Sequence, residues 1–295
     1  MVSMSIIGLG RVGGALALSL PADRYTVENL VVSSSFDFIS FANSFSSSTQ
    51  IKTLDESSEL NSDVIFITTQ DAQIVSVAKE LAKKINGSPI LFHTSGSYPS
   101  SILKDLKAAG GRTGSIHPLV SISKSELGPE RFRGAFFCVE GEPDAVEMGR
   151  RIVNDLGGRP FTIDTQFKTL YHAAAVTACG HLVALLDAAV EMMTKCGLSA
   201  DESKNILMPL VTSTVQNLND QSPAEALTGT FARADIETFT RHLTALNENV
   251  SEDLLEIYLL LGERSLELAA KQGVNRERID TLRTKVLIAK SKLKW

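Results

Sequence analysis

The stretch Met4-Ser5-Ile6-Ile7-Gly8-Leu9-Gly10-Arg11-Val12-Gly13-Gly14 decides the fold of this chain. Its first residues are typical of a buried β-strand, and a helical pattern begins directly after the glycines. A Gly-x-Gly-x-x-Gly run between a strand and a helix is the fingerprint of a dinucleotide-binding βαβ unit. Gly8 would allow the tight turn, Gly10 the close approach of a pyrophosphate, and Gly13 the packing of helix on strand. The alternative is a glycine-rich turn that holds no ligand.

Composition excludes several classes of function. The chain has 295 residues, enough for about two domains, and its net charge of -5 provides no basic field for nucleic acid. Its three isolated cysteines favour a reducing cytoplasm and argue against a metal or disulfide framework. The first residues lack the charged and cleavage patterns of a secretion signal, so we expect a protein that is not secreted. Residues 173–186 are apolar but too short to span a bilayer, so we predict a core helix there and no membrane partner.

The pattern of the chain changes at about residue 165. Before it, β-branched runs alternate with helical patterns, as expected of βαβ units. The strand-like runs are 4–9, 30–33, 63–69, 89–93, 113–117, 135–140 and 160–164, and the helical patterns are 12–20, 71–84, 100–109 and 143–156. After it come only helical patterns, at 168–196, 200–218, 235–246, 252–272 and 275–293. We predict an α/β fold, with a Rossmann-type doubly wound parallel sheet in residues 1–164 and an all-α domain in residues 165–295.

The helical domain carries a surplus of apolar positions. Residues 254–268 hold more leucine, isoleucine and tyrosine than a single buried stripe requires. A second surface must cover this helix, and the sequence leaves open whether it is another helix of the domain or a partner subunit. We expect a homodimer that forms through the helical domain.

The residues after the second strand favour NADP over NAD. An NAD site has an acidic residue there, which binds the ribose 2′-hydroxyl, whereas this chain reads Val32-Ser33-Ser34-Ser35. Hydroxyl groups, together with Arg11, tolerate a 2′-phosphate better than a carboxylate does. Asp37 keeps NAD open, although it reads equally well as a helix cap. The predicted cofactor-binding residues are Gly8, Leu9, Gly10, Arg11, Val12, Gly13, Ser33, Ser34, Ser35, Thr68, Thr69 and Thr94.

Polar residues follow the central strands, where ligands of open α/β sheets bind. Thr68 is the better cofactor contact there, and Asp71 is predicted to cap the next helix. We expect His93 to point into the sheet layers. Ser95 either orients a substrate carbonyl or carboxylate or caps the turn that follows it. His117, held extended by the next proline, suits proton transfer, and a structural role is the alternative.

Lys168 and His172 share one face of the first long helix because they are four residues apart. They would lie at the seam of the two domains, where Lys168 could bind an acidic group or donate a proton and His172 could orient the substrate. The alternative is a solvated helix face. His181, further along, is predicted to be satisfied in the core. The predicted catalytic residues are therefore Ser95, His117, Lys168 and His172.

These motifs resemble the 6-phosphogluconate dehydrogenase-like superfamily, which joins a Rossmann domain to a helical domain and includes β-hydroxyacid dehydrogenases and pyrroline-5-carboxylate reductase. The resemblance covers nearly the whole chain. In β-hydroxyacid dehydrogenases an essential lysine is followed four residues on by asparagine, and this chain offers Lys168 and His172. Ser95-Gly96 and His117-Pro118 also resemble the serine and His-Pro pair of prephenate dehydrogenase, but the helical half does not support that identity.

The chain resembles most a bacterial family that is named NADP-dependent oxidoreductases after its cofactor fold and that has a helical domain of unknown function. The shared motifs are His93-Thr94-Ser95-Gly96, Gly114-Ser115-Ile116-His117-Pro118-Leu119, Tyr171-His172-Ala173-Ala174-Ala175-Val176 and Ala226-Leu227-Thr228-Gly229. The last motif usually continues Pro-x-Ala-Arg-Gly-Asp, whereas here it reads Thr230-Phe231-Ala232-Arg233-Ala234-Asp235. The resemblance implies oxidoreductase chemistry without implying a particular substrate.

The sequence thus predicts hydride transfer between NADP and a small substrate, one that carries a carboxylate and binds in a cleft between the domains. The predicted substrate-binding residues are Ser95, His117, Thr228 and Arg233. The alternative is an NADP(H)-binding sensor or interaction protein that has no catalytic activity, because the lysine–asparagine pair is altered.

Overall fold

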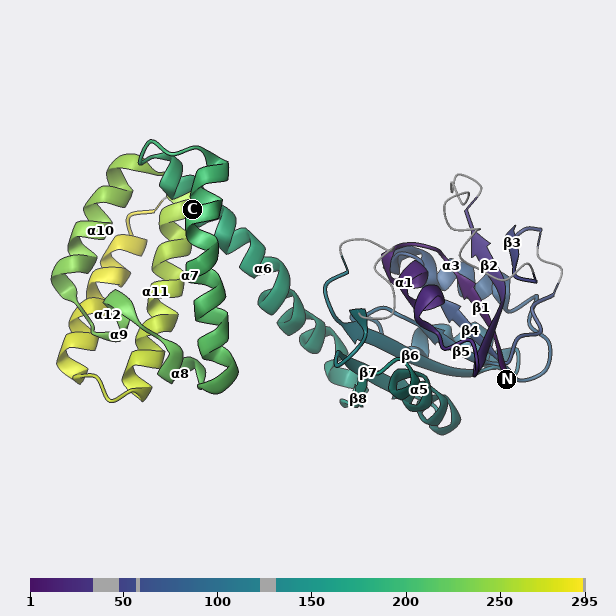
Figure 1. The fold of residues 1–295 in the computed structure, drawn as a ribbon. Helices are drawn as coiled ribbons and strands as arrows, with labels where there is room; N and C mark the ends of the chain where they lie inside the picture. Colours follow the sequence, from purple (N-terminus) through teal and green to yellow (C-terminus); the bar gives the residue numbers. More distant parts are fainter. Residues whose placement is uncertain (34–47, 57–58, 123–130, 294–295) are drawn as a thin grey trace. The chain divides into compact units, whose positions relative to one another are not determined.

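The computed structural model describes residues 1–33, 48–56, 59–122 and 131–293. The chain forms two compact units, Met1–Cys179 and Gly180–Trp295 (Figure 1). The units divide inside the long helix α6 (Lys168–Thr194), so the first turns of that helix pack with the first unit. The predicted domain boundary at residues 164 and 165 stays a prediction.

The first unit is built on one sheet, in which the described residues form eight strands in the order β3-β2-β1-β4-β5-β6-β7-β8. The strands are β1 (Val2–Ile7), β2 (Tyr25–Val32), β3 (Gln50–Thr53), β4 (Val64–Ile67), β5 (Ile90–His93), β6 (Arg112–Leu119), β7 (Phe136–Gly141) and β8 (Arg159–Phe161). The order reverses beside β1, where the chain crosses from β3 to β4. This is the doubly wound arrangement predicted from the sequence, and its ligand crevice lies at the carboxyl ends of the strands.

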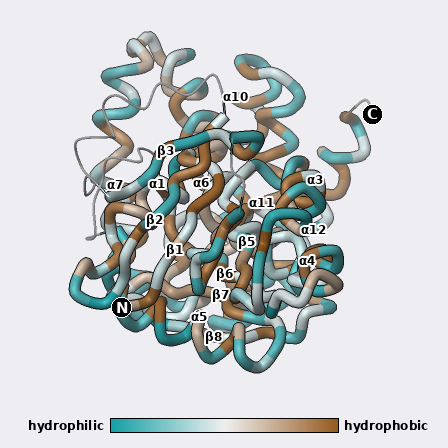
Figure 2. The backbone as a smooth tube through the Cα atoms, turned by 90° about the vertical axis from the view of Figure 1, so that its right-hand side faces the viewer, coloured by the Kyte–Doolittle hydropathy of each residue, from teal (hydrophilic) through white to brown (hydrophobic). Residues whose placement is uncertain are grey.

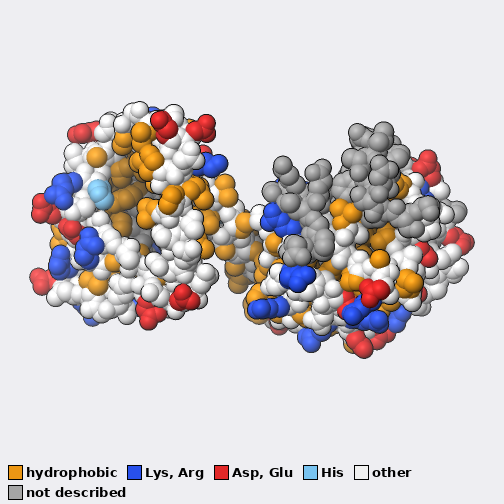
Figure 3. All heavy atoms as spheres, viewed as in Figure 1, with side chains coloured by type: hydrophobic (Ala, Val, Ile, Leu, Met, Phe, Trp, Pro, Cys, Tyr) orange, Lys and Arg blue, Asp and Glu red, His pale blue; other side chains and the backbone are white. Residues whose placement is uncertain are grey.

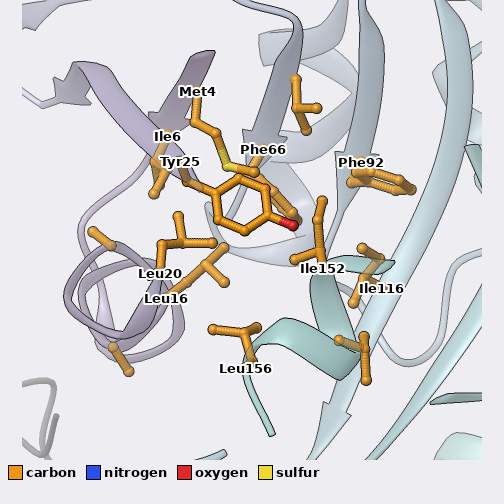
Figure 4. Packing of buried hydrophobic residues seen from close by; sticks show 14 of the residues in the cluster. Met4, Ile6, Leu16, Leu20, Tyr25, Phe66, Phe92, Ile116, Ile152 and Leu156 are labelled. Carbon is orange, nitrogen blue, oxygen red and sulfur yellow. The ribbon is translucent and has the colours of Figure 1, made fainter. Parts of the chain in front are cut away.

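Helices cover both faces of the sheet because alternate strand residues are apolar on both sides. On one face, α1 (Arg11–Ser19) and α5 (Pro143–Asp155) pack on a cluster that includes Met4, Phe66 and Ile116. Figure 4 shows residues of this cluster from both helices and from the strands. On the other face, α3 (Asp71–Leu81), the 3-10 helix η1 (Ser100–Leu103) and α4 (Lys104–Ala108) pack on Ile7, Ile65 and Leu91.

Two details of the sheet differ from the prediction. The strand β3 was not among the predicted strands. It is a short, half-exposed edge strand, and its polar residues Gln50 and Lys52 obscure the apolar pattern by which a strand is recognised. All strands were predicted to be parallel, but β7 runs antiparallel to β6. A parallel pair needs a crossover of a dozen or more residues that is usually helical, and the sequence between runs 113–117 and 135–140 shows no helical pattern. The missing helical pattern was therefore the signal in the sequence that β6 and β7 pair antiparallel.

The second unit is helical, as predicted. Besides the end of α6, it contains α7 (Ala200–Asp220), α8 (Pro223–Ala226), α9 (Gly229–Ala232), α10 (Ile236–Asn249), α11 (Glu252–Lys271) and α12 (Arg276–Lys290). The short helices α8 and α9 are too brief for a periodic pattern and were not predicted. The core of the unit is made by α10, α11 and α12 around Phe239, Leu259 and Leu282. Part of the cover that residues 254–268 require is therefore supplied within the unit.

The middle of α6 is not part of a core. Its tube is brown over much of its length in Figure 2, and hydrophobic side chains lie exposed along it in Figure 3. Leu182 is 42% exposed and Val183 is 68% exposed. His181 is exposed as well, so its predicted burial is wrong. By length and composition alone, Thr165–Thr194 could cross a membrane, which for a single helix is weak evidence.

Candidate functional site

The turn between β1 and α1 has the geometry that the glycine motif predicts. Gly8 has a φ of 97°, a conformation that strongly favours glycine. A Cβ on Gly13 would collide with the Gly8 carbonyl oxygen and the Thr68 hydroxyl, whereas a Cβ on Gly10 would meet no atom within 4 Å. The Thr68 hydroxyl donates to the carbonyl oxygens of Ile7 (3.1 Å) and Gly8, which holds the turn against β4.

The amino terminus of α1 opens on a cavity. Gly10 is the N-cap of the helix and has no side chain to satisfy the first amides. The cavity of about 490 Å³ is lined by Gly8, Leu9, Gly10, Val32, Ser33, Thr68, Thr69 and neighbouring residues of α3. The Thr69 hydroxyl is buried and has no hydrogen-bond partner in the described part of the chain. Amides with a partial positive charge and an unpaired hydroxyl therefore face a space large enough for part of a dinucleotide.

Half of the predicted cofactor-binding residues line this cavity: Gly8, Leu9, Gly10, Ser33, Thr68 and Thr69. Arg11 is exposed on the first turn of α1, and Ser33 is exposed after β2. Thr94 directly follows β5, and its amide donates to the carbonyl oxygen of Ile67. It is not among the residues that line the cavity. Ser34 and Ser35, and with them Asp37, lie outside the described residues.

Ser95 and Asp71 are joined by a hydrogen bond that the sequence did not predict. The Ser95 hydroxyl donates to the Asp71 carboxylate at 2.8 Å and accepts from the amides of Ser97 and Tyr98. The predicted helix cap by Asp71 is wrong, because α3 begins at Asp71 and its N-cap is Gln70. Ser95 instead organises the turn after β5, which is the capping alternative. Its side chain is almost fully buried, so these contacts leave it little capacity for substrate.

His93 is fully buried, as predicted, and its Nδ1 accepts the Ser95 amide at 3.2 Å. Burial, reinforced by the charge of Lys168, lowers the pKa of His93 to about 4. The ring is therefore neutral at pH 7. Its role is to fix the turn that carries Ser95 and Gly96.

His117, Tyr171 and His172 form a cluster at the carboxyl end of β6. The His117 Nδ1 lies 2.7 Å from the Tyr171 hydroxyl. The rings of His117 and His172 meet edge to face, with centroids 5.5 Å apart, and a Cβ on Gly96 would collide with nitrogens of both rings. Burial, with added repulsion from His172 and Lys168, lowers the pKa of His117 to about 4. A neutral imidazole at pH 7 acts through hydrogen bonds and does not carry a spare proton.

Lys168 lies next to this cluster and is buried in the first unit. Its Nζ donates to the Glu140 carboxylate at 2.9 Å and to the Ser115 hydroxyl, and its side chain is 1% exposed. Burial pushes the pKa of Glu140 up, but the charge and hydrogen bond of Lys168 and the bonds from Ser100 outweigh it and lower that pKa. The solvated helix face considered for Lys168 is therefore wrong. The ammonium is committed to an internal ion pair that anchors the start of α6.

Thr228 and Arg233 belong to the second unit, where both are exposed. They flank the short helix α9, and Gln272 donates to the carbonyl oxygen of Leu227, just before this helix, at 3.0 Å. Ala234 adopts a φ of 44° at the place where the bacterial family has glycine. Among the described residues, no three or more His, Cys, Asp or Glu side chains are arranged to hold a metal ion.

Comparison with known families agrees with this architecture. Residues 1–118 match a Rossmann-like domain, and residues 135–265 match the domain of unknown function DUF2520. This confirms the resemblance and the fold class predicted from the sequence. A comparison with curated proteins finds no match.

Solved structures are similar to this fold at low sequence identity. The "putative NADP oxidoreductase" BF3122 of Bacteroides fragilis is 19% identical with a TM-score of 0.71, covering 90% of this chain and 98% of its own. Protein TM1727 of Thermotoga maritima is 23% identical with a TM-score of 0.70, covering 91% and 99%. Plasmodium falciparum pyrroline carboxylate reductase, solved with NADP bound, is 14% identical with a TM-score of 0.54, covering 91% and 98%. These likenesses show the fold.

The sequence reasoning missed three residues that organise the site. Tyr171 had a signal, since it lies between Lys168 and His172 in one of the shared motifs. Glu140 and Ser115 had weaker signals: each is a polar residue inside a strand-like run, at a position where a buried partner is needed.

Proposed function

We propose that this protein is an NADP-dependent oxidoreductase that transfers a hydride between the nicotinamide and a small substrate bearing a carboxylate. The observation that carries the proposal is the uncapped amino terminus of α1, which opens through Gly10 onto the cavity beside Thr68 and Thr69. Two of the structural neighbours named above are an NADP oxidoreductase by name and a reductase with NADP bound, which supports the cofactor class.

The residues present fit the cofactor. The amides of the first turn of α1 would bind the pyrophosphate, because Gly10 offers no side chain that would block its approach. Thr69 would gain a partner for its buried hydroxyl. Arg11 and Ser33, which are both exposed near this end of the sheet, are the described residues that we propose for the 2′-phosphate. Their chemistry is the ground for placing NADP above NAD.

The chemistry of the reaction is divided between cofactor and protein. NADPH, when bound, supplies the hydride. The protein would orient the substrate at the end of β6, where His117 and His172 face Gly96. His172, which is partly exposed, is the residue we propose to bring the proton that completes a reduction. Lys168 and Ser95 would hold the residues of this site in position. Thr228 and Arg233 are proposed as substrate contacts on the basis of their side-chain chemistry alone.

We also propose that a second copy of the chain covers α6. Monomeric proteins rarely expose apolar patches of this kind. A membrane is the weaker alternative, because Lys168, Tyr171 and His172 pack with the sheet of the first unit. The apolar residues 173–186 beyond them amount to about 21 Å of helix at 1.5 Å per residue, which is short of a bilayer core of about 30 Å.

Calorimetric titration with NADPH and NADH tests the cofactor proposal. Wild-type protein should bind NADPH more tightly than NADH. Gly10→Ala should fold normally, since its Cβ meets no protein atom and its φ of -71° suits alanine, but should bind NADPH at least tenfold more weakly. Unchanged thermal unfolding of Gly10→Ala is the control. If neither cofactor binds wild-type protein, the oxidoreductase proposal is wrong.

A turnover assay distinguishes an NADP-dependent enzyme from a sensor that binds NADPH without catalytic activity. NADPH oxidation should be measured with a panel of keto acids, imines and aldehydes, and NADP reduction with hydroxy acids. Turnover of any member, lost in His172→Asn, would support the proposed chemistry. Tight NADPH binding without turnover across the panel would favour the sensor.

A further inference from the structure

We propose that Tyr171 is a positioning residue that holds His117 in the tautomer protonated on Nε2, so that His117 presents a hydrogen-bond donor to the substrate. The tautomer is inferred from the contacts and the burial of the described residues. Only the identity of the acceptor, a carbonyl oxygen or imine nitrogen that is to be reduced, rests on the proposed function.

The direction of the Tyr171–His117 hydrogen bond is decided by the phenol. The hydroxyl lies 2.7 Å from His117 Nδ1, and the two rings meet edge to face with centroids 5.6 Å apart. Phe161 packs against the other side of the Tyr171 ring, which holds it in place. Burial raises the pKa of Tyr171 well above its usual value, so the phenol keeps its proton. In the described part of the chain no other acceptor bonds to this hydroxyl, so the phenol proton has a partner only when it is donated to Nδ1.

The state of His117 follows from this bond. The groups that face its ring are His172, Lys168, Asp71 and His93, and burial with the first two keeps the imidazole neutral at pH 7. A neutral imidazole carries one proton, and a nitrogen that accepts a hydrogen bond cannot carry it. Because Nδ1 accepts from Tyr171, the proton is on Nε2.

The Nε2 atom of His117 packs against Gly96 beside a buried nitrogen that needs a polar partner. A Cβ on Gly96 would collide with His117 Nε2 and with His172 Nδ1, so both nitrogens converge on the surface of Gly96. His172 Nδ1 is buried and has no hydrogen-bond partner in the part of the chain that the structure describes. A buried polar atom without a partner is rare in proteins unless a ligand or water supplies one. Because not even a Cβ fits between Gly96 and these nitrogens, a substrate atom must approach the Nε2–H donor from the open side of the partly exposed His117 ring.

The tautomer decides which chemistry His117 can perform. With the proton on Nε2, the imidazole polarises a carbonyl or imine as hydride arrives, and it cannot act as a base toward that atom. With the proton on Nδ1, Nε2 would be an acceptor and would suit the removal of a proton from a hydroxyl substrate. Tyr171 therefore favours substrates that are hydrogen-bond acceptors at the reacting atom.

Nitrogen-15 NMR of the full-length protein tests the tautomer directly. Two-bond correlations of labelled histidine distinguish a protonated from an unprotonated ring nitrogen, and His117→Asn assigns the signals. In wild-type protein, His117 should show a protonated Nε2 and an unprotonated Nδ1. In Tyr171→Phe the ring should become a mixture of both tautomers, because the donor to Nδ1 is lost.

The second unit contains a matched control. The His242 Nδ1 lies 2.8 Å from the Tyr258 hydroxyl, so Tyr258→Phe removes the same kind of bond from a different histidine. This variant should change the His242 signals and leave those of His117 unchanged. A change at His117 in Tyr171→Phe but not in Tyr258→Phe would show that the effect belongs to the Tyr171 hydroxyl.

Two results would overturn the inference. A protonated Nδ1 in wild-type His117 would mean that Tyr171 accepts, and an unchanged tautomer in Tyr171→Phe would mean that the phenol does not set it. The wild-type spectrum decides the first point even if the variant does not fold. Failure of NADPH to bind in calorimetry would instead overturn the proposed function and leave the tautomer result as it stands.

Discussion

Lys168 and Glu140 form an ion pair that is shut off from water: Nζ lies 2.9 Å from the carboxylate, and the two side chains are 1% and 3% exposed. Ser115 and Ser100 complete the hydrogen bonds of the pair. The pair joins the first turn of α6 to β7. Because Tyr171 and His172 lie about one turn further along α6, the pair positions both of them beside His117.

Removing one partner of this pair should be costly. Lys168→Met leaves the Glu140 carboxylate buried without its countercharge, and Glu140→Leu leaves the ammonium in the same position. We expect each variant to lose about 3–5 kcal/mol in free energy of unfolding. The double variant should lose much less than the two losses together, because it buries no unpaired charge. Urea unfolding followed by circular dichroism measures all four proteins, and strictly additive losses would contradict the buried-pair interpretation.

The sequence predicted the helix that carries Lys168 and the shared face of Lys168 and His172, because these depend only on the helical period. It did not predict that Lys168 is buried. That outcome depends on Glu140, which is brought beside β6 by an antiparallel strand pairing. Contacts of this kind join residues that are distant along the chain, and local patterns do not record them.

Asp71 illustrates the same limit from another direction. An acidic residue at the start of a helix is a good cap by composition, and the helix begins where predicted. The carboxylate instead accepts from Ser95 and Ser97, on the turn after the next strand. The turn at Gly8 and the close packing of Gly13, in contrast, were predicted correctly, because the glycine motif records them locally.

Gly13→Ala should damage both the fold and cofactor binding. Its Cβ would collide with the backbone oxygen of Gly8, which cannot move without opening the turn that Thr68 holds. We expect a loss of about 1–3 kcal/mol in free energy of unfolding and at least tenfold weaker NADPH binding. Thermal unfolding and calorimetry measure the two effects. Wild-type values for both would show that α1 can tilt away from β1 without cost.

Stability should fall as the pH is lowered from about 6.5 to 4, in part because of His93. The folded protein keeps this ring neutral until its pKa of about 4, while the unfolded chain binds the proton near the ordinary value of 6.5. In that window the unfolded state holds more protons, so acid favours unfolding, by about 3 kcal/mol over the whole window. The cause is the cost of placing a charge in the buried position of His93.

The variant His93→Asn isolates this contribution. Its amide oxygen can replace Nδ1 as the acceptor for the Ser95 amide, but it does not titrate. Between pH 6.5 and 4, urea unfolding of this variant should depend less on pH, by about 1.4 kcal/mol per pH unit. An unchanged slope in His93→Asn would mean that His93 does not stay neutral in the folded protein.

A charge on the bare face of α6 should break the proposed homodimer. Val183 is 68% exposed on this helix, and Val183→Glu would bury an unpaired carboxylate if a second copy covers it. We expect the dissociation constant of the dimer to rise at least 100-fold, a loss of about 2.7 kcal/mol. Val75→Glu, at a 50% exposed position of α3, makes the same change on the first unit and should leave the dimer intact. Sedimentation equilibrium would reveal the wild-type mass as twice 31.8 kDa, and a monomeric wild type would refute the proposed cover of α6.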